Sequence, residues 1–263
     1  MQIIDRGHGD ALVLVPGIQG RWEYMGPAID ALSTSHRVIT FPLCGERGSD
    51  RQFDAGRGLD NFVDQIDAVL DNRGLRRAVI CGVSFGGLVA LRFAARRPAR
   101  TSALILVSAP GPAFQPAKRH RLYARAPVVF GLVFVAEIPG RVHDELAVAL
   151  PDGRARRQFS WRQIRTFARA PISLSRMAAR SMLMCESGAR DDCAQVVAPT
   201  LVVTGERHLD RVVPVDGTSE YARLIPGARL VRIERTGHVG YISRPDAFVR
   251  IVSEFLGQKH AAA

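Results

Sequence analysis

The sequence predicts an α/β fold built on a doubly wound, mostly parallel sheet. Short apolar runs rich in Val, Ile and Leu alternate with helical patterns through most of the 263 residues. The runs are apolar almost without interruption, as expected for strands that helices cover on both faces. Such alternation is typical of β-α-β units, which assemble parallel sheets. With 47% hydrophobic and 23% charged residues, the composition is that of a folded globular chain.

Seven strands are expected in chain order. They span 2–5, 11–15, 37–41, 78–81, 103–107, 201–204 and 230–233. The first two runs are joined by the short sequence RGHGD, whose glycines favour a turn. We therefore expect these two strands to form an added antiparallel hairpin, and the other strands to be parallel.

Helical patterns follow several of these strands. They span 59–72, 85–96, 217–224 and 246–256. In the first, Phe62, Ile66 and Leu70 fall on one side of a helix, which gives it an apolar face to pack against the sheet. The second opens after a glycine-rich turn and stops before Pro98, because proline cannot continue a helix.

The segment 111–198 interrupts the alternation. It contains no clear strand, and prolines separate its helical patches. It holds 14 basic and 7 acidic residues, so about +7 of the formal net charge of +11 lies there. We expect a helical cap over the carboxyl edge of the sheet, on a core formed by 1–110 and 199–260. The surplus charge indicates either a solvated outer face or a patch that faces anions.

The composition also restricts the partners. No block of five like charges occurs and aromatic residues are not interleaved with the arginines, so nucleic-acid binding is not expected. The four cysteines have neither a CxxC pair nor metal-ligand spacing, which favours a reduced, cytoplasmic chain. The N-terminus lacks a signal-peptide pattern, and the apolar stretch 127–138 is shorter than the roughly 20 residues of a membrane span. No metal, nucleotide or flavin motif occurs, so we expect no cofactor.

A candidate nucleophile lies in GVSFGG, residues 82–87, between an expected strand and an expected helix. A serine hydroxyl is a weak nucleophile unless it is exposed, oriented and paired with a base. A tight strand-to-helix turn would expose Ser84 at the sheet edge, and it needs Gly82 and Gly86 because side chains there would collide. We expect Ser84 to be catalytic; the alternative is a glycine-rich turn whose serine only caps the helix.

A general base and an acid to orient it are expected on later loops. His238, in TGHVG, follows the last strand on a loop that can carry its imidazole to Ser84. Asp210 lies in the loop after the preceding strand, and Glu206 on the same loop is the alternative acid. His208 is the nearest alternative base. The chain order serine, aspartate, histidine is that of one particular plan among serine hydrolases.

Further residues are expected around the nucleophile. The oxyanion of the transition state needs N–H donors, and the backbone N–H of Phe85 is one candidate. Ile18, in the loop PGIQG after the strand 11–15, is the other; the alternative is a plain strand-to-helix connection. Trp22, Phe130 and Phe134 are candidates to contact the substrate. The alternative for the apolar stretch that holds the two phenylalanines is the cap's own core.

These motifs resemble the α/β-hydrolase fold superfamily, in the form with a helical cap after the sixth strand. PGIQG, LCGERGSD, GVSFGG, LDRVVP and TGH carry the resemblance, which covers nearly the whole chain outside the cap. It implies a nucleophile, acid and base at Ser84, Asp210 and His238, with oxyanion donors at Ile18 and Phe85. The chain departs from many members of the superfamily at Pro16-Gly17, where they have His-Gly.

The resemblance implies a serine esterase with a Ser-His-Asp triad that forms an acyl-enzyme. We expect carboxylic esters of short to medium acyl chain as substrates, with thioesters and lactones as related ones. A serine at this turn argues against dehalogenases and epoxide hydrolases, whose turn carries an aspartate. Carbon–carbon bond hydrolysis, acyl transfer and perhydrolysis use the same groups and remain alternatives. A non-enzymatic ligand receptor that keeps the triad is the alternative of a different class.

Overall fold

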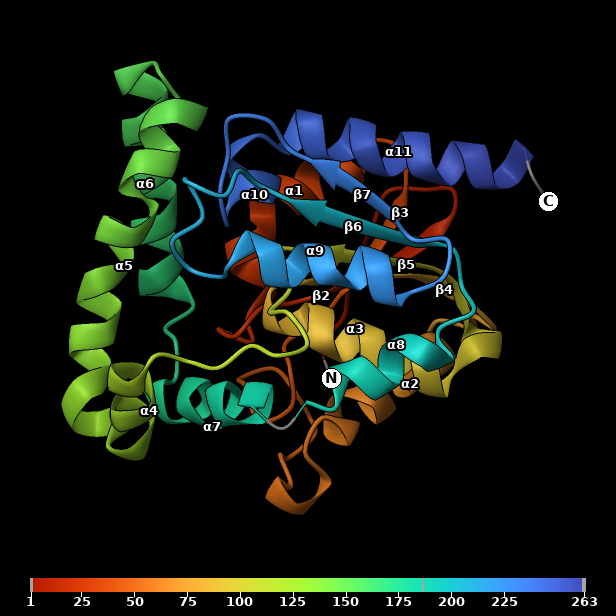
Figure 1. The fold of residues 1–263 in the computed structure, drawn as a ribbon, viewed down its shortest axis with the longest axis horizontal. Coiled ribbons are helices and arrows are strands. Elements are labelled where there is room, and N and C mark those ends of the chain that lie inside the picture. Colours follow the sequence, from red (N-terminus) through yellow and green to blue (C-terminus); the bar gives the residue numbers. More distant parts are fainter. Residues whose placement is uncertain (1, 186, 262–263) are drawn as a thin grey trace.

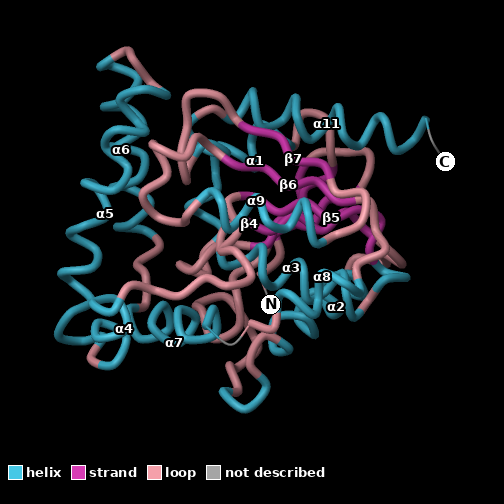
Figure 2. Tube along the Cα trace, viewed as in Figure 1, coloured by secondary structure: helices cyan, strands magenta, loops and turns pink. Residues whose placement is uncertain are grey.

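The structure, a computed structural model, describes residues 2–185 and 187–261, without the side chains at 120, 122, 125, 128, 132, 134 and 259–261. Its centre is a seven-stranded sheet with the order β1-β3-β2-β4-β5-β6-β7 (Figures 1 and 2). The strands are β1 (Ile4–Arg6), β2 (Ala11–Val15), β3 (Arg37–Thr40), β4 (Ala78–Val83), β5 (Thr101–Val107), β6 (Thr200–Thr204) and β7 (Arg229–Arg232). All neighbouring pairs are parallel except β1 and β3. The predicted mostly parallel sheet is confirmed.

The predicted hairpin of the first two strands is wrong. β1 pairs with β3, antiparallel, with Ile4 opposite Thr40. The reason is that β2 pairs with β3 on one side and with β4 on the other, so neither of its edges is open to β1. The sequence RGHGD is therefore a connection that carries the chain from the edge of the sheet to its interior.

Helices cover both faces of the sheet, as the uninterrupted apolar strands predict. One layer holds α1 (Gly26–Leu32), α10 (Gly240–Ser243) and α11 (Pro245–Ala261), and the other holds α2 (Asp60–Asn72), α3 (Phe85–Arg96) and α9 (Val215–Leu224). Short 3-10 helices lie at η1 (Trp22–Met25), η2 (Ala55–Arg57) and η3 (Pro98–Arg100). Along β2, Val13 and Val15 pack with the α2 and α3 layer, and Leu12 and Leu14 with the other. The strand is buried on both faces.

A helical insertion separates β5 from β6. It comprises α4 (Lys118–Arg125), α5 (Pro127–Ala149), α6 (Gly153–Arg169), α7 (Leu174–Cys185) and α8 (Ala189–Gln195). The arrows of β6 and β7 point toward it, so it lies at the carboxyl edge of the sheet (Figure 1). α8 packs in the core layer beside α3. The insertion lies in the segment that the sequence predicts. The prediction places it after the sixth strand, but the strand before it, β5, is the fifth of this chain, because only β1 precedes the parallel strands.

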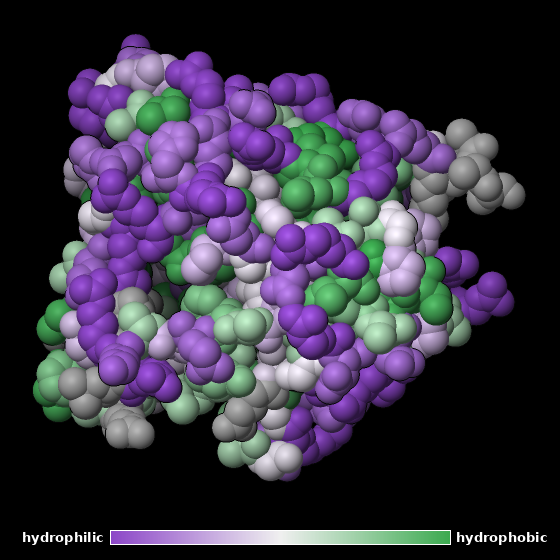
Figure 3. All heavy atoms as spheres, viewed as in Figure 1, coloured by the Kyte–Doolittle hydropathy of each residue, from purple (hydrophilic) through white to green (hydrophobic). Residues whose placement is uncertain are grey.

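The surface of the insertion carries many arginines together with exposed apolar side chains such as Val129, Trp161 and Ile164. Five of the arginines on α6 are exposed, at positions 154, 157, 162, 165 and 169. Hydrophilic side chains cover much of the visible face where α5 and α6 lie (Figure 3). A good part of the surplus charge predicted for this segment thus lies on a solvated face. None of the helices in the described part of the chain has the length and apolar character needed to span a bilayer.

Candidate active site

Ser84 lies in a strained turn between β4 and α3. Its φ of 52° and ψ of −122° are unusual for a residue with a side chain, and such strain is concentrated at functional sites. A Cβ atom on Gly82 would lie 2.1 Å from the Gly86 carbonyl oxygen, and one on Gly86 would lie 2.4 Å from that of Val15. Only glycine fits these two positions. The N–H of Ser84 donates to the carbonyl of Val107 at 2.8 Å, which ties the turn to β5.

The loop that follows β2 runs beside Ser84. A Cβ atom on Gly17 would lie 3.5 Å from the Cβ of Ser84, and Ile18 lines the same cavity as Ser84. On the other side, Phe85 begins α3, and its buried ring packs edge-on against Phe62 with centroids 5.5 Å apart. Both residues predicted as oxyanion donors therefore lie close to Ser84.

His238 and Asp210 are brought together from two different loops. The His238 Nδ1 lies 3.3 Å from the Asp210 Oδ2. The other carboxylate oxygen, Oδ1, accepts the N–H groups of Val212 and Val213 at 2.9 Å each. The Asp210 side chain is only 2% exposed and that of His238 10%. The carboxylate is thus fixed by backbone donors, and a proton on Nδ1 would leave Nε2 of His238 free to accept another.

The alternative acid and base point elsewhere. Glu206 accepts the N–H of Arg235, and its other oxygen lies 3.6 Å from Nε2 of His208. The His208 side chain is 72% exposed. Glu206 and His208 therefore form a pair with each other near the surface, whereas Asp210 is the acid that meets His238.

Glu145, on α5, is a residue of this site that sequence reasoning missed. It is buried, and its carboxylate accepts the N–H of Val239, the neighbour of His238, at 2.9 Å. Burial raises the pKa of Glu145 to about 7, against the hydrogen bonds from the backbone and the charge of His238, which lower it. No motif marks Glu145, because only the packing of α5 on the loop after β7 brings it here.

Two carboxylates act on the titration of His238. Burial lowers the pKa of the imidazole, since it disfavours the charged form. The charge and hydrogen bond of Asp210, followed by the charge of Glu145, act in the opposite direction. Their combined effect is larger, so the pKa of His238 lies above its usual range.

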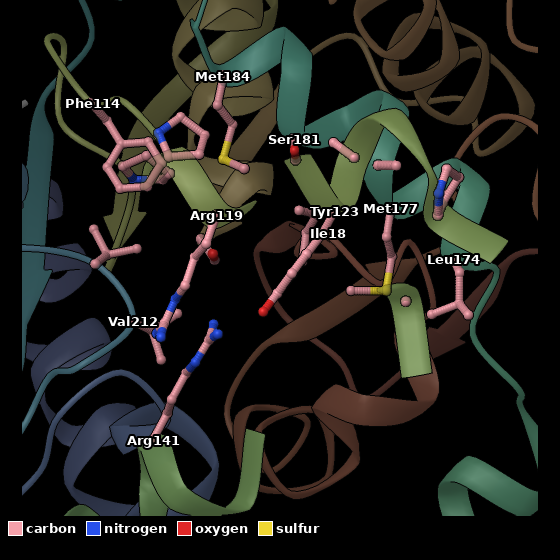
Figure 4. Close-up of a pocket in the computed structure, with 18 of the residues that line it drawn as sticks. Ile18, Phe114, Arg119, Tyr123, Arg141, Leu174, Met177, Ser181, Met184 and Val212 are labelled. Atoms are coloured by element: carbon pink, nitrogen blue, oxygen red, sulfur yellow. The ribbon is translucent and has the colours of Figure 1, made fainter. Parts of the chain in front are cut away.

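Ser84 opens into a cavity of about 360 Å³ between the sheet edge and the insertion. Much of its wall is apolar and comes from the insertion and the loop after β5, including Phe114, Leu174, Met177 and Met184 (Figure 4). The loop after β6 contributes Val212 and Val213. The sequence identifies none of these residues, because the faces that α4, α5 and α7 turn toward the sheet depend on how the insertion packs.

Two of the three predicted substrate contacts, Trp22 and Phe130, do not line this cavity. Trp22 lies in η1 and packs against the core layer of α1 and α11, because the chain turns away from Ser84 after the loop 16–20. Phe130 stacks on Tyr123 with ring centroids 5.5 Å apart, so it stands behind a residue that does line the cavity. The side chain of Phe134 lies outside the described residues.

Charged residues also reach the cavity. Arg119, Arg141 and Arg211 line it together with Ser84. Arg121, another arginine of the insertion, is exposed and does not line the cavity. Over the described residues, no cluster of three or more His, Cys, Asp or Glu side chains is arranged to hold a metal ion.

Comparison with known proteins places these features in a family. The family model described as "Alpha/beta hydrolase family" matches residues 12–251. The chain is 27% identical over 261 residues to a 2-hydroxy-6-oxo-2,4-heptadienoate hydrolase of Pseudomonas putida, with 96% of this chain and 91% of that protein covered. It is 28% identical over 257 residues to a pimeloyl-[acyl-carrier protein] methyl ester esterase of Aeromonas hydrophila, with 95% and 97% covered.

Among solved structures, the enol-lactonase from Burkholderia xenovorans has a similar fold. The TM-score is 0.75 at 21% identity, with 97% of this chain and 96% of that chain covered. The family model thus extends from β2 into α11 and spans the turn at Ser84, the loops of Asp210 and His238 and the insertion between them. The chain belongs to the alpha/beta hydrolase family.

Proposed function

We propose that this protein is a serine hydrolase that cleaves carboxylic esters through an acyl-enzyme. The observation that carries the proposal is the strained Ser84 turn, which opens into a partly enclosed cavity. The same cavity is lined by Val212 and Val213, whose N–H groups hold the buried Asp210 that meets His238. In this scheme Ser84 is the nucleophile, His238 the general base and Asp210 the acid that fixes the imidazole tautomer.

The proposed reaction has two halves. In the first, the Ser84 Oγ attacks the ester carbonyl while His238 Nε2 takes its proton, and the oxyanion is held by the N–H groups of Ile18 and Phe85. His238 then gives the proton to the departing alcohol. In the second half, water attacks the acyl-enzyme with His238 again as base, and the acid and free Ser84 are released. A cavity of about 360 Å³ under the insertion favours short to medium acyl chains.

The test uses p-nitrophenyl esters of increasing chain length together with a fluorophosphonate probe. The wild-type protein is expected to hydrolyse the esters and to be labelled. Ser84→Ala is expected to lose about 10⁶-fold in kcat and all labelling. Ser181→Ala is the matched control, because Ser181 lines the same cavity without the strained turn, and it should keep both activities. Labelling of Ser84→Ala, or turnover above a few per cent of wild type, contradicts the assignment.

Carbon–carbon bond hydrolysis is the second candidate. It is favoured by the 27% identity, over nearly the full length of both chains, to a 2-hydroxy-6-oxo-2,4-heptadienoate hydrolase. Ester cleavage ranks first because an alkoxide is a better leaving group than a carbanion, although both take a proton as they depart. Loss of the absorbance of a 2-hydroxy-6-oxo-dienoate, at a kcat/KM above that for every p-nitrophenyl ester tested, would reverse this order.

A further inference from the structure

Two arginines of the insertion meet on the wall of the Ser84 cavity. Arg119 comes from α4 and Arg141 from α5, and their side chains extend toward each other in Figure 4. Arg141 is only 16% exposed, whereas Arg119 is 61% exposed. The charge of Arg141, in this partly enclosed position, is screened less by salt than a charge on an open surface. This pair is therefore able to attract an anion inside the cavity.

A single carboxylate joins the two arginines. Glu137 forms an ion pair with Arg141 and lies 3.8 Å from Arg119, and it accepts a hydrogen bond from the Tyr123 hydroxyl at 3.4 Å. Glu137 thus holds both guanidinium groups close to one another on the cavity wall. The third lining arginine, Arg211, forms an ion pair with Asp144 and adds no net charge.

We propose that the cavity binds esters that carry a carboxylate remote from the scissile bond, with Arg141 and Arg119 as its ligands. Two guanidinium groups on one wall of the cavity suit a carboxylate, because guanidinium groups bind carboxylates with paired hydrogen bonds. The apolar residues Phe114, Leu174 and Met177 on the same wall suit a hydrocarbon chain between the carboxylate and the ester. The inference deepens the proposed ester hydrolysis and rests on it.

The test compares esters that differ only in this charge. On the acyl side, p-nitrophenyl hydrogen adipate is compared with its neutral methyl ester. On the leaving-group side, 4-carboxyphenyl hexanoate is compared with its methyl ester. In at least one pair, Arg141→Gln is expected to lower the charged-to-neutral ratio of kcat/KM by about 10- to 100-fold, the range for a lost charge-assisted hydrogen bond. Comparing variant with wild type cancels the intrinsic reactivity of each ester.

Three further variants sharpen the result. Arg121→Gln removes an exposed arginine of α4 that does not line the cavity, and it should leave the ratio unchanged. Glu137→Gln removes the shared carboxylate and should raise the ratio, an effect that general damage to the fold would not produce. Arg141→Lys keeps the charge but not the paired hydrogen bonds, and it should recover part of the preference.

The outcomes separate this inference from the proposed function. In one outcome, the neutral esters are hydrolysed with dependence on Ser84, but Arg141→Gln and Glu137→Gln leave the charged-to-neutral ratio of kcat/KM unchanged for both pairs. This outcome overturns the carboxylate site and leaves the esterase proposal standing. If no ester is hydrolysed, the esterase proposal fails. The carboxylate site is then tested by calorimetry, which measures the binding of p-nitrophenyl hydrogen adipate and 4-carboxyphenyl hexanoate to Ser84→Ala. The site is supported if either ester binds more tightly than its methyl ester and if this difference disappears in Ser84→Ala/Arg141→Gln. Equal binding of the charged and the neutral ester in both pairs refutes the site.

Discussion

The acid that meets His238 can be identified from hydrogen bonds alone. One carboxylate oxygen of Asp210 accepts two backbone N–H groups, and the other faces the imidazole of His238. Glu206 instead accepts the N–H of Arg235 and lies beside His208. A carboxylate held in this way stabilises the imidazolium that forms when a serine is deprotonated. The two acids of one loop thus have separable roles.

Asp210→Asn is expected to lower kcat by about 10⁴-fold, because the amide would favour the wrong imidazole tautomer. Glu206→Gln, the matched change on the same loop, is expected to stay within a few-fold of wild type. Steady-state hydrolysis of a p-nitrophenyl ester measures both. A larger loss in Glu206→Gln than in Asp210→Asn would show that the orienting acid has been misassigned.

The pH dependence follows from the two carboxylates that act on His238. The base must be neutral, and its pKa lies above the usual value near 6.5, so kcat/KM should rise with pH with its midpoint above 6.5. Glu145→Gln removes one negative charge, which makes the imidazolium less stable and should move the midpoint to lower pH. The glutamine oxygen can still accept the N–H of Val239. A profile flat from pH 5 to 9 would argue against a histidine base.

The control for this shift is Glu206→Gln, whose carboxylate lies beside His208 rather than His238. It should leave the midpoint where it is in the wild-type profile. An equal shift in Glu206→Gln and Glu145→Gln would indicate a general change in net charge rather than a local effect of Glu145. A merely structural role of Glu145 would lower kcat without moving the midpoint.

At the scale of single residues, local sequence identifies the centre of the site and not its surroundings. Gly82 marks the turn of Ser84 because a side chain there would collide with Gly86 within the same turn, whereas a side chain at Gly86 would collide with the carbonyl of Val15 on the neighbouring strand. Glu145 and Arg141 carry no such mark, since their relation to His238 and Ser84 depends on the packing of a distant helix. The sequence shows that these two side chains are charged, but it does not show toward which part of the fold they point.

Among the elements, α7 fixes the loop beside Ser84. Arg180, on this helix, donates to the carbonyl of Ile18 at 3.0 Å and to the Glu46 carboxylate at 2.7 Å. The side chains of Arg180 and Glu46 are only 3% and 2% exposed. Arg176 also reaches Glu46, at 3.4 Å. The insertion is thereby anchored to the core through a buried ion pair that also contacts the predicted oxyanion loop.

Arg180→Met is expected to lower the free energy of unfolding by about 3 kcal/mol, because it leaves Glu46 buried without its closest partner. The double variant Arg180→Met/Glu46→Leu should lose less than Arg180→Met, since no unpaired charge then remains. Urea denaturation measures both. The exposed pair Arg190–Glu220 is the control, and Arg190→Met should cost about 1 kcal/mol or less. Equal losses in Arg180→Met and Arg190→Met would contradict a buried anchor.

The sequence predicts which elements form more reliably than how they are joined. The strands and the helix over 85–96 follow from local apolar patterns, and they are found as expected. The predicted partner of β1 is wrong because a tight connection favours a hairpin, whereas β3 and β4 occupy both edges of β2. In the insertion, Pro127, Pro151 and Pro171 lie at or just before the starts of helices, as predicted, but Pro139 lies inside α5, where the predicted break is wrong. The prolines do not indicate which face of each helix turns toward the sheet.

At the scale of the whole molecule, two groups of arginines in the insertion differ in their surroundings. The α6 arginines lie on a solvated surface, while Arg119 and Arg141 line the cavity with Ser84. The two interpretations of the surplus charge, a solvated face or an anion-facing patch, therefore apply to different helices. Surface charge acts at a distance and fades with salt, whereas direct contacts in a partly enclosed cavity are screened less.

This division predicts two responses to salt. For a carboxylate-bearing ester, kcat/KM should fall as the salt concentration rises from 0.01 to 0.5 M, because the screening length shrinks from about 30 Å to below 8 Å. Replacing the exposed Arg157, Arg162 and Arg165 of α6 with Gln should flatten this fall while leaving the preference over the neutral ester at 0.5 M unchanged. Arg141→Gln should do the opposite: it should remove most of the preference at 0.5 M and retain much of the salt dependence. Steady-state kinetics on the matched ester pair at both salt concentrations measures the two effects. If the α6 variant and Arg141→Gln both change the salt dependence, or both change the preference at 0.5 M, the surface arginines and the cavity arginines do not act separately.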